Sequence, residues 1–150
     1  MLPSCTRSNL VRVFSLFLFS LAGCSSSFHG IKFRAQSPLK EEAFRKLSLA
    51  ISVDSYEIEK IDPENMQLLT KWRPSKENER SEKEKKSGGA SLVRIDLRME
   101  SRGTLYDIFL TPMIQSVEGE QRIAEIGHPL RDKWKRIIGE IVQKETKEEG

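Results

Sequence analysis

Four side chains in this sequence of 150 residues have the types that most often do chemistry, two cysteines and two histidines. The thiol of Cys24 can serve as a nucleophile, a metal ligand or a site of covalent modification. His29 and His128 can act as general bases or metal ligands, but no second histidine or cysteine stands at ligand spacing from either. We therefore expect neither a metal site nor a cofactor, and the surroundings of Cys24 are the most informative part of the chain.

Cys24 ends a short apolar segment that has a basic start. Arg7 and Arg12 precede an uncharged run at residues 13–22, which closes in Leu21-Ala22-Gly23-Cys24. A basic region, an apolar stretch of about ten residues and small residues at its end form the secretory signal pattern. The run is too short for a stable membrane span, which needs roughly 20 apolar residues. An uncleaved short anchor, or a secretory signal that meets a cysteine by chance, is the alternative.

The residues Leu21-Ala22-Gly23-Cys24 resemble the lipobox of bacterial lipoproteins. The resemblance implies that residues 1–23 are a signal peptide, that the lipoprotein signal peptidase removes it, and that Cys24 carries lipid on its sulfur and its new amine. It also implies a protein that faces the periplasm. In the sorting rule of enteric bacteria, aspartate after the lipidated cysteine retains a lipoprotein at the inner membrane, whereas serine lets it travel onward. Ser25 therefore implies the outer membrane.

Composition limits what the rest of the chain can be. Without residues 1–23, 127 of the 150 residues remain, which is enough for one domain with a single modest core. Arg7 and Arg12 leave with the signal, so 23 basic residues face 22 acidic ones, a formal charge of +1 in place of +3. That balance implies neither nucleic acid nor anionic lipid as a partner. Cys5 leaves as well, so with Cys24 lipidated we expect no disulfide and no cysteine metal ligand.

Two segments have the apolar spacing of amphipathic helices. The first begins at Ser37, a residue that favours helix caps, continues through Pro38 and fades near Val53. The second begins near Pro129. Its apolar stripe, at i, i+4, i+7, i+8, i+11 and i+12, consists of Leu130, Trp134, Ile137, Ile138, Ile141 and Val142. Both stripes predict packing against a sheet.

Four segments between the helices alternate with the period of two that is typical of strands. Residues 56–61 and 66–72 flank the turn Asp62-Pro63-Glu64-Asn65, and residues 93–99 and 105–110 flank a turn with Gly103. We expect Met66, Leu68 and Trp72 to share the buried face of their strand. We expect Val93, Ile95, Leu97 and Met99 to be buried in theirs.

These elements predict an α+β fold, a two-layer sandwich. Its antiparallel four-stranded sheet of two hairpins is flanked by an N-terminal and a C-terminal helix. The predicted organisation is a signal peptide at residues 1–23, a lipidated tether at 24–36, a single periplasmic domain at 37–144 and a charged tail at 145–150. For part of the tether, an edge strand is the alternative.

Residues 55–72 are similar to the helix-then-hairpin opening of small Gram-negative outer-membrane lipoproteins. Tyr56-Glu57-Ile58-Glu59 and Thr70-Lys71-Trp72 flank an Asp-containing turn, although the turn lacks a glycine. The helix-grip domains of a lipoprotein in the outer-membrane barrel-assembly machine are built in this general way. The similarity implies a helix-grip-like α+β fold.

Two further regions have open interpretations. Residues 73–91 are strongly charged, and we expect a long solvated loop there. Leu105 and Phe109 alternate with Tyr106 and Ile108, so one pair points away from the helices. An exposed Leu105 and Phe109 would form a small contact surface; alternatively, the tether or residues 115–127 cover them.

No local motif indicates catalysis. The sequence has no Gly-x-Ser-x-Gly, phosphate-loop or dinucleotide pattern, although a Ser-His-Asp site stays open because its members meet only in space. We expect a protein that is not an enzyme, that contacts the membrane through lipid on Cys24, and that holds or contacts another envelope protein. The alternative is a binding module for a lipid or other envelope ligand held between the sheet and the helices.

Overall fold

The computed structural model describes residues 28–36, 40–89 and 91–148. In chain order the elements are β1 (Ile31–Gln36), α2 (Lys40–Val53), β2 (Ile58–Asp62), β3 (Gln67–Thr70), β4 (Arg73–Pro74), the 3-10 helix η1 (Glu77–Glu79), α3 (Glu82–Lys86), β5 (Leu92–Arg102), β6 (Leu105–Gln115), β7 (Gln121–Ile123) and α4 (Pro129–Glu148). The predicted signal peptide, Cys24, Ser25 and the predicted helix start at Ser37 lie outside the described residues.

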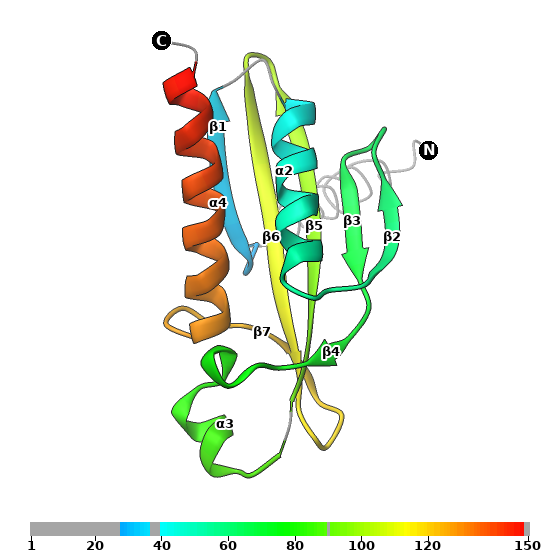
Figure 1. The fold of residues 1–150 in the computed structure, drawn as a ribbon, viewed down its shortest axis with the longest axis vertical. Helices are drawn as coiled ribbons and strands as arrows, with labels where there is room; N and C mark the ends of the chain where they lie inside the picture. The colour runs from blue at the N-terminus through cyan, green and yellow to red at the C-terminus, as the bar shows by residue number, and fades with distance from the viewer. Residues whose placement is uncertain (1–27, 37–39, 90, 149–150) are drawn as a thin grey trace, which may run out of the picture.

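The strands form one antiparallel sheet in the order β1-β6-β5-β3-β2, with β4 added beside β5 and β7 beside β6. Figure 1 shows α2 and α4 side by side over the same face of this sheet. The predicted α+β class with an antiparallel sheet is confirmed. The predicted number of four strands is wrong, because the described part of the chain contributes seven, and α3 is a third helix.

The additional strands are short or lie where the sequence pattern is mixed. β1 falls inside residues 24–36, which we assigned to the tether with an edge strand as the alternative, and it pairs with residues 105–110 of β6. Ile31 and Ala35 are buried, whereas Lys32 and Arg34 are exposed on the other face. β4 and β7 have only two and three residues, too few for a visible alternation.

β5 and β6 are the central hairpin and pair along their full length of 11 residues each. Val93, Ile95, Leu97 and Met99 are buried, as predicted. The side chains between them leave on the face turned away from α2 and α4, which we call the outer face. By register it carries Arg94, Asp96, Arg98, Glu100 and Arg102 from β5, Asp107, Phe109 and Thr111 from β6, and Lys32 and Arg34 from β1.

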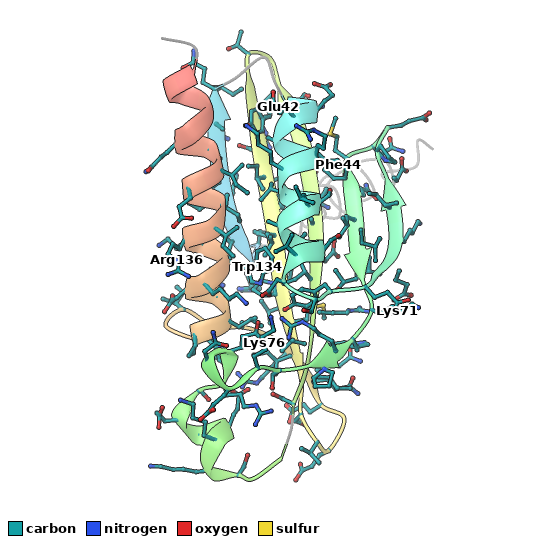
Figure 2. All side chains as sticks on the ribbon, in the orientation of Figure 1. Glu42, Phe44, Lys71, Lys76, Trp134 and Arg136 are labelled. Carbon is teal, nitrogen blue, oxygen red and sulfur yellow. The ribbon has the colours of Figure 1, made fainter. Side chains whose placement is uncertain are left out.

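The core lies between the other face of the sheet and the two long helices. In Figure 2, Trp134 points from α4 into the space between the layers, and Arg136 points away from it. The stripe residues Leu130, Trp134 and Ile138 are fully buried, which confirms the predicted orientation of the last helix. None of the helices in the described ranges combines the length and the apolar character needed to cross a bilayer.

A β-bulge reverses the strand alternation between β3 and β4. Leu69 pairs with Asp96, and Arg73 pairs with Val93. The chain therefore advances four residues on one side while β5 advances three on the other. One extra residue in a strand sends all following side chains to the opposite face.

The bulge has two consequences. Arg73 turns into the interior and is buried. Trp72 lies on the outer face, where the guanidinium carbon of Arg94 stands 4.7 Å from its ring centre. The prediction that Trp72 shares the buried face of Met66 and Leu68 is therefore wrong, although those two residues are buried.

The predicted solvated loop at residues 73–91 is also wrong in its first half and at its last residue. Arg73, Ser75 and Glu79 are buried, as is Ser91 at the end of the segment, and the hydroxyls of Ser75 and Ser91 are 2.9 Å apart. Hydropathy alone assigns such residues to solvent, but ion pairs and hydrogen bonds offset the cost of burying them. From Glu82 onward the segment matches the prediction better, because Lys83, Lys85 and Lys86 are exposed.

Candidate functional site

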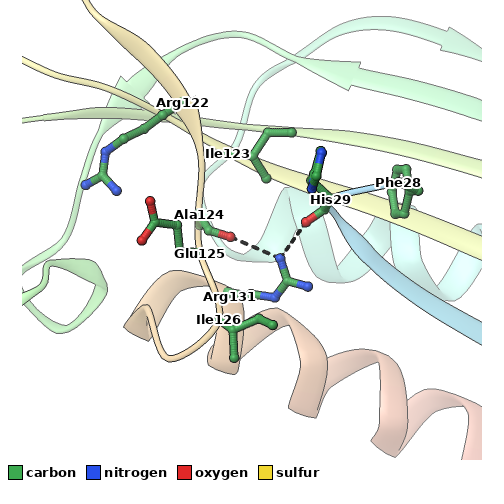
Figure 3. Close-up of a pocket in the computed structure, with 8 residues that line it drawn as sticks. All are labelled: Phe28, His29, Arg122, Ile123, Ala124, Glu125, Ile126 and Arg131. Carbon is green, nitrogen blue, oxygen red and sulfur yellow. Dashed lines mark hydrogen bonds between the residues drawn. The ribbon is translucent and has the colours of Figure 1, made fainter. Parts of the chain in front are cut away.

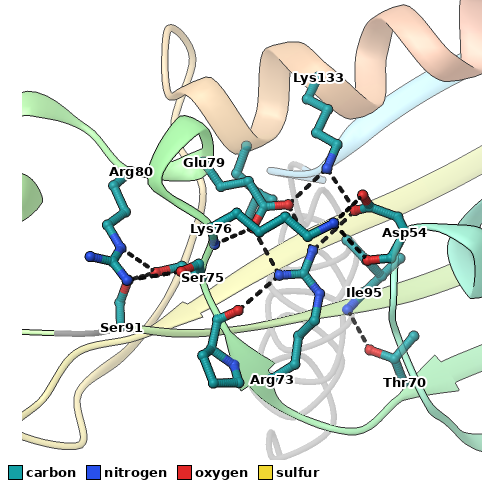
Figure 4. Close-up of polar contacts among 12 residues, drawn as sticks. Asp54, Thr70, Arg73, Ser75, Lys76, Glu79, Arg80, Ser91, Ile95 and Lys133 are labelled. Atoms are coloured by element: carbon teal, nitrogen blue, oxygen red, sulfur yellow. Dashed lines mark hydrogen bonds and ion pairs between the residues drawn. The ribbon is translucent and has the colours of Figure 1, made fainter.

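Four charged side chains from different parts of the chain meet beneath the first turns of α4 (Figure 4). Asp54, Arg73, Glu79 and Lys133 form what we call the ionic cluster. The guanidinium of Arg73 donates to the two carboxylate oxygens of Glu79 at 2.7 and 2.9 Å and to Asp54 at 3.0 Å. Nζ of Lys133 donates to Glu79 at 2.8 Å and to Asp54 at 2.6 Å. The cluster therefore joins α2, β4, η1 and α4.

Local structure explains how each member reaches the cluster. Asp54 directly follows α2, at the turn where Ser55 has a φ of 70°. The bulge turns Arg73 inward, and Glu79 ends η1, where its carboxylate also accepts the backbone N–H of Lys76 at 2.8 Å. Lys133 precedes the buried Trp134, so it stands at the edge of the apolar stripe of α4.

The charges of the cluster support one another. Burial alone would raise the pKa of Glu79, but the hydrogen bonds from Arg73, Lys133 and the backbone of Lys76 lower that pKa to about 2. Burial works against the charge of Arg73, yet the bonds to Glu79 raise the arginine pKa. The guanidinium carbon of Arg73 also lies 3.8 Å from the ring centre of Tyr56, and burial raises the pKa of that phenol.

Such an arrangement is better suited to holding elements together than to proton transfer. Both carboxylates are paired with Arg73 and with Lys133. A carboxylate with a pKa near 2, as for Glu79, holds protons too weakly to be an efficient base near neutral pH. We therefore interpret the ionic cluster as a structural clamp.

The two histidines have different surroundings. His128 is buried; its Nε2 lies 2.8 Å from a carboxylate oxygen of Glu84, and its Nδ1 accepts the backbone N–H of Leu130 at 3.2 Å. The proton therefore belongs on Nε2, which donates to Glu84. His29 is exposed, and its carbonyl accepts from Arg131 at 2.7 Å. Within the described ranges, no group of three or more histidine, cysteine, aspartate or glutamate residues could hold a metal ion.

Glu84 fastens α3 to the body of the protein, because it pairs with both Arg122 and His128. We expect trypsin to cut the folded chain first at the exposed lysines of α3, before Arg80. Glu84→Ala should speed that first cut on the order of fivefold, since losing about 1 kcal/mol of local contacts raises the open population by that factor. Mass spectrometry of the earliest fragments measures both the site and the rate.

The matched control for this prediction is Glu82→Ala in the same turn. Glu82 is exposed and pairs only with Lys85 among the ion pairs of the described residues. Its removal should leave the rate unchanged within a factor of two, as for most exposed pairs. Equal acceleration by the two substitutions would show that Glu84 does not hold α3.

An open pocket of about 720 Å³ lies at the sheet edge where β1 begins and β7 ends (Figure 3). Arg131 of α4 ties its walls together, because its guanidinium donates to the carbonyls of His29, Gly30 and Ala124 at 2.7, 3.0 and 3.1 Å. Apolar surface is available at its rim, where Ile126 is 90% exposed. The volume is in the range of small-molecule sites, but a largely open site buries less of a ligand.

The outer face carries an unusual concentration of cations. Asp107 is the centre, with a side chain that no solvent reaches. Arg34 donates to it at 2.8 Å, Arg102 lies 2.9 Å away and Lys32 lies 3.9 Å away. These three cations are 44–57% exposed themselves. One carboxylate thus organises three positive charges at the surface of the sheet.

Phe109 lies on the same face and is covered. The ring of Phe28 packs edge-on against it at 5.0 Å between centres. The charged ends of Lys32 and Arg98 stand 5.4 and 4.9 Å from its centre. Leu105 is half-buried. For Phe109 the structure therefore favours the alternative that the chain ahead of the domain covers this face, together with long basic side chains.

No protein-family model matches the chain, and no curated protein sequence matches it. Its function must therefore be argued from its own residues.

Sequence reasoning missed the ionic cluster. Glu79 belongs to a run of alternating charges in which nothing distinguishes it from Glu77, and Arg73 looks exposed unless the bulge is known. Lys133, at the edge of an apolar stripe, was the only usable signal. The basic character of the outer face was visible in Arg94 and Arg98, but not the contribution of β1.

Proposed function

We propose that this chain is a lipid-anchored periplasmic envelope protein with a non-catalytic structural, assembly or protein-interaction role. The observation that carries the proposal is the sequence Leu21-Ala22-Gly23-Cys24 at the end of a basic and then apolar segment. A cysteine modified on sulfur and amine carries more than one acyl chain, which is what lasting anchorage requires. Serine at position 25 supports the outer membrane as the destination.

The folded domain is consistent with an interaction role. The charged side chains beneath α4 are paired with one another in the ionic cluster. The space between the sheet and the helices is filled by buried side chains such as Leu47, Ile51 and Leu97. Two open surfaces of the described part of the chain are the pocket where β1 begins and β7 ends, which we call the edge pocket, and the outer face. Open surfaces favour contact with a large partner over the enclosure of a substrate.

A second candidate is a binding module for a lipid or another envelope ligand. The edge pocket, with the exposed Ile126 at its rim and Phe28 and Ile123 in its wall, is the observation that favours it. Its place differs from the space between sheet and helices that we expected for such a ligand. Extraction of the purified protein with organic solvent, followed by mass spectrometry, tests it: a lipid that is not attached to Cys24 would support this candidate.

The test of the anchor is Cys24→Ala. The variant should lose all incorporation of a fatty-acid analogue, because the mature chain has no other cysteine that could replace Cys24. Its cleavage by the lipoprotein signal peptidase should fail as well, so the variant should run larger on a gel.

Cys5→Ala is the matched control, because that cysteine lies in the segment that is removed. It should keep both labelling and cleavage. Label retained on Cys24→Ala would contradict the proposed lipid anchor.

A further inference from the structure

We propose that the outer face of the sheet is a second membrane contact, lying against the headgroups of anionic phospholipids. The inference rests on the proposed lipid anchor at Cys24 and adds an orientation to it. The domain would not hang freely from its tether. It would lie with α2 and α4 turned toward the periplasm and with the basic face of the sheet on the bilayer.

The first support is the short distance between the anchor and this face. Phe28 packs on Phe109, which belongs to the outer face. Cys24 is only four residues ahead of Phe28. Four residues reach about 14 Å at full extension. The acylated end of the chain is therefore confined to within that distance of the position where Phe28 meets the sheet.

The second support is charge. Lys32, Arg34 and Arg102 share the single carboxylate of Asp107, which leaves two positive charges without a counter-charge there. Across β1, β5 and β6 the outer face carries five cations, Lys32, Arg34, Arg94, Arg98 and Arg102, against three carboxylates, Asp96, Glu100 and Asp107. Lys60 and Asp62 of β2 lie on the same face by register, and their charges cancel. Its excess of two exceeds the formal +1 of the chain from residue 24 onward. Clusters of Lys and Arg next to a membrane are attracted to anionic headgroups.

The third support is the way these cations are presented. Arg34 and Arg102 are held by Asp107 yet remain half-exposed, so each keeps N–H groups that can donate to a phosphate oxygen. Trp72 lies on the same face beneath Arg94, and tryptophan is enriched at the level of the headgroups. Basic and aromatic side chains thus lie on the face against which Phe28 packs.

The experiment uses the purified lipidated protein, inserted into vesicles through its anchor. A fluorescent NBD group is attached at Thr111→Cys, on the outer face, or at Arg136→Cys, on the exposed side of α4 (Figure 2). Acylated Cys24 does not react with the maleimide label. The rate at which aqueous dithionite destroys the label reports its access to water. Vesicles contain phosphatidylethanolamine with either phosphatidylglycerol or phosphatidylcholine.

We expect the label at 111 to react several-fold more slowly than the label at 136 with phosphatidylglycerol present, and at an equal rate without it. High salt should remove the difference, because it screens the charges. Lys32→Ala and Arg98→Ala should each lower the ratio of docked to free protein on the order of fivefold, the factor that corresponds to about 1 kcal/mol per cation. The matched controls, Arg45→Ala on α2 and Lys135→Ala on α4, remove the same charge from exposed positions in the helix layer and should have no effect.

Equal reaction rates at 111 and 136 in anionic vesicles, with fatty acid detected on Cys24, would overturn the docking proposal and leave the anchor standing. Protection of position 111 that arises only when other envelope proteins are added would also overturn it, in favour of a protein partner. Absence of fatty acid from the wild-type chain would instead defeat the proposed anchor, and the orientation argument with it. The salt dependence is measured with all five cations of β1 and β5 on the outer face in place, so it does not depend on whether the alanine variants fold.

Discussion

Glu79→Ala is expected to lower the free energy of unfolding by on the order of 3–5 kcal/mol, the usual cost of removing one partner from a buried ion pair. The substitution leaves Arg73 buried with Asp54 as its remaining carboxylate, and it takes one of two carboxylates from Lys133. A small domain has about 5–15 kcal/mol of net stability, so the loss is a large share of the whole. The melting temperature should fall by roughly 10 °C or more, measured by circular dichroism.

Glu77→Ala is the matched control, because Glu77 is the exposed first residue of the same 3-10 helix. It removes a charge of the same sign within one turn and should shift melting by no more than a degree or two. Similar destabilisation by both substitutions would mean that loss of negative charge near η1, and not the buried contact of Glu79, is responsible.

The same carboxylate predicts a specific acid response. In the folded protein the pKa of Glu79 is about 2, below the ordinary value of 4.5. The unfolded chain therefore takes up this proton at a higher pH than the folded chain, and stability falls as pH drops from about 5 toward 2. Glu79→Gln has no carboxylate to titrate at this position. The difference in free energy of unfolding between wild type and this variant should therefore shrink as the pH falls from about 5 toward 2. A constant difference between pH 7 and pH 3 would contradict the low pKa.

The sequence predicted best those elements in which the spacing of apolar residues continues over several helical turns or along a whole strand. The stripe of α4 and the alternation of β5 each extend far enough that Trp134 and Ile95 had one consistent orientation, and both are buried. The prediction failed where one extra residue breaks a period. The bulge before Arg73 is a single residue long, and it reverses the alternation within that segment, so the predicted burial of Trp72 was wrong.

The burial of charged side chains was the second feature that the sequence did not predict. Glu79 and Glu77 are equivalent in hydropathy, and only the positions of Arg73 and Lys133 in space distinguish them. Those partners lie 6 and 54 residues away in the sequence. A pattern of spacing cannot predict such a contact, because it depends on how β4 and α4 approach each other. The contribution of β1 to the basic outer face could not be predicted for the same reason. Lys32 and Arg34 lie near Arg98 only because β1 pairs with β6.

Trp134→Ala is expected to cost on the order of 3–5 kcal/mol, as for other large aromatic side chains truncated in a core. Trp134 is fully buried between α4 and the sheet, and its ring packs edge-on against Tyr56 at 6.0 Å between centres. Tyr56 in turn lies beneath Arg73 of the ionic cluster. The cavity would therefore open next to the buried charges, and the melting temperature should fall visibly or the domain should unfold.

Lys135→Ala, at the next residue on the exposed side of α4, removes a side chain from the same helix without opening a cavity and should shift melting little. Trp134→Phe keeps an aromatic ring in the core, so it should lose less than half of the stability that Trp134→Ala loses. The opposite result is informative as well. If Trp134→Ala leaves melting unchanged but abolishes recovery of a membrane partner, then α4 presents its apolar stripe to another protein, and the tryptophan is an interface anchor and not part of the core.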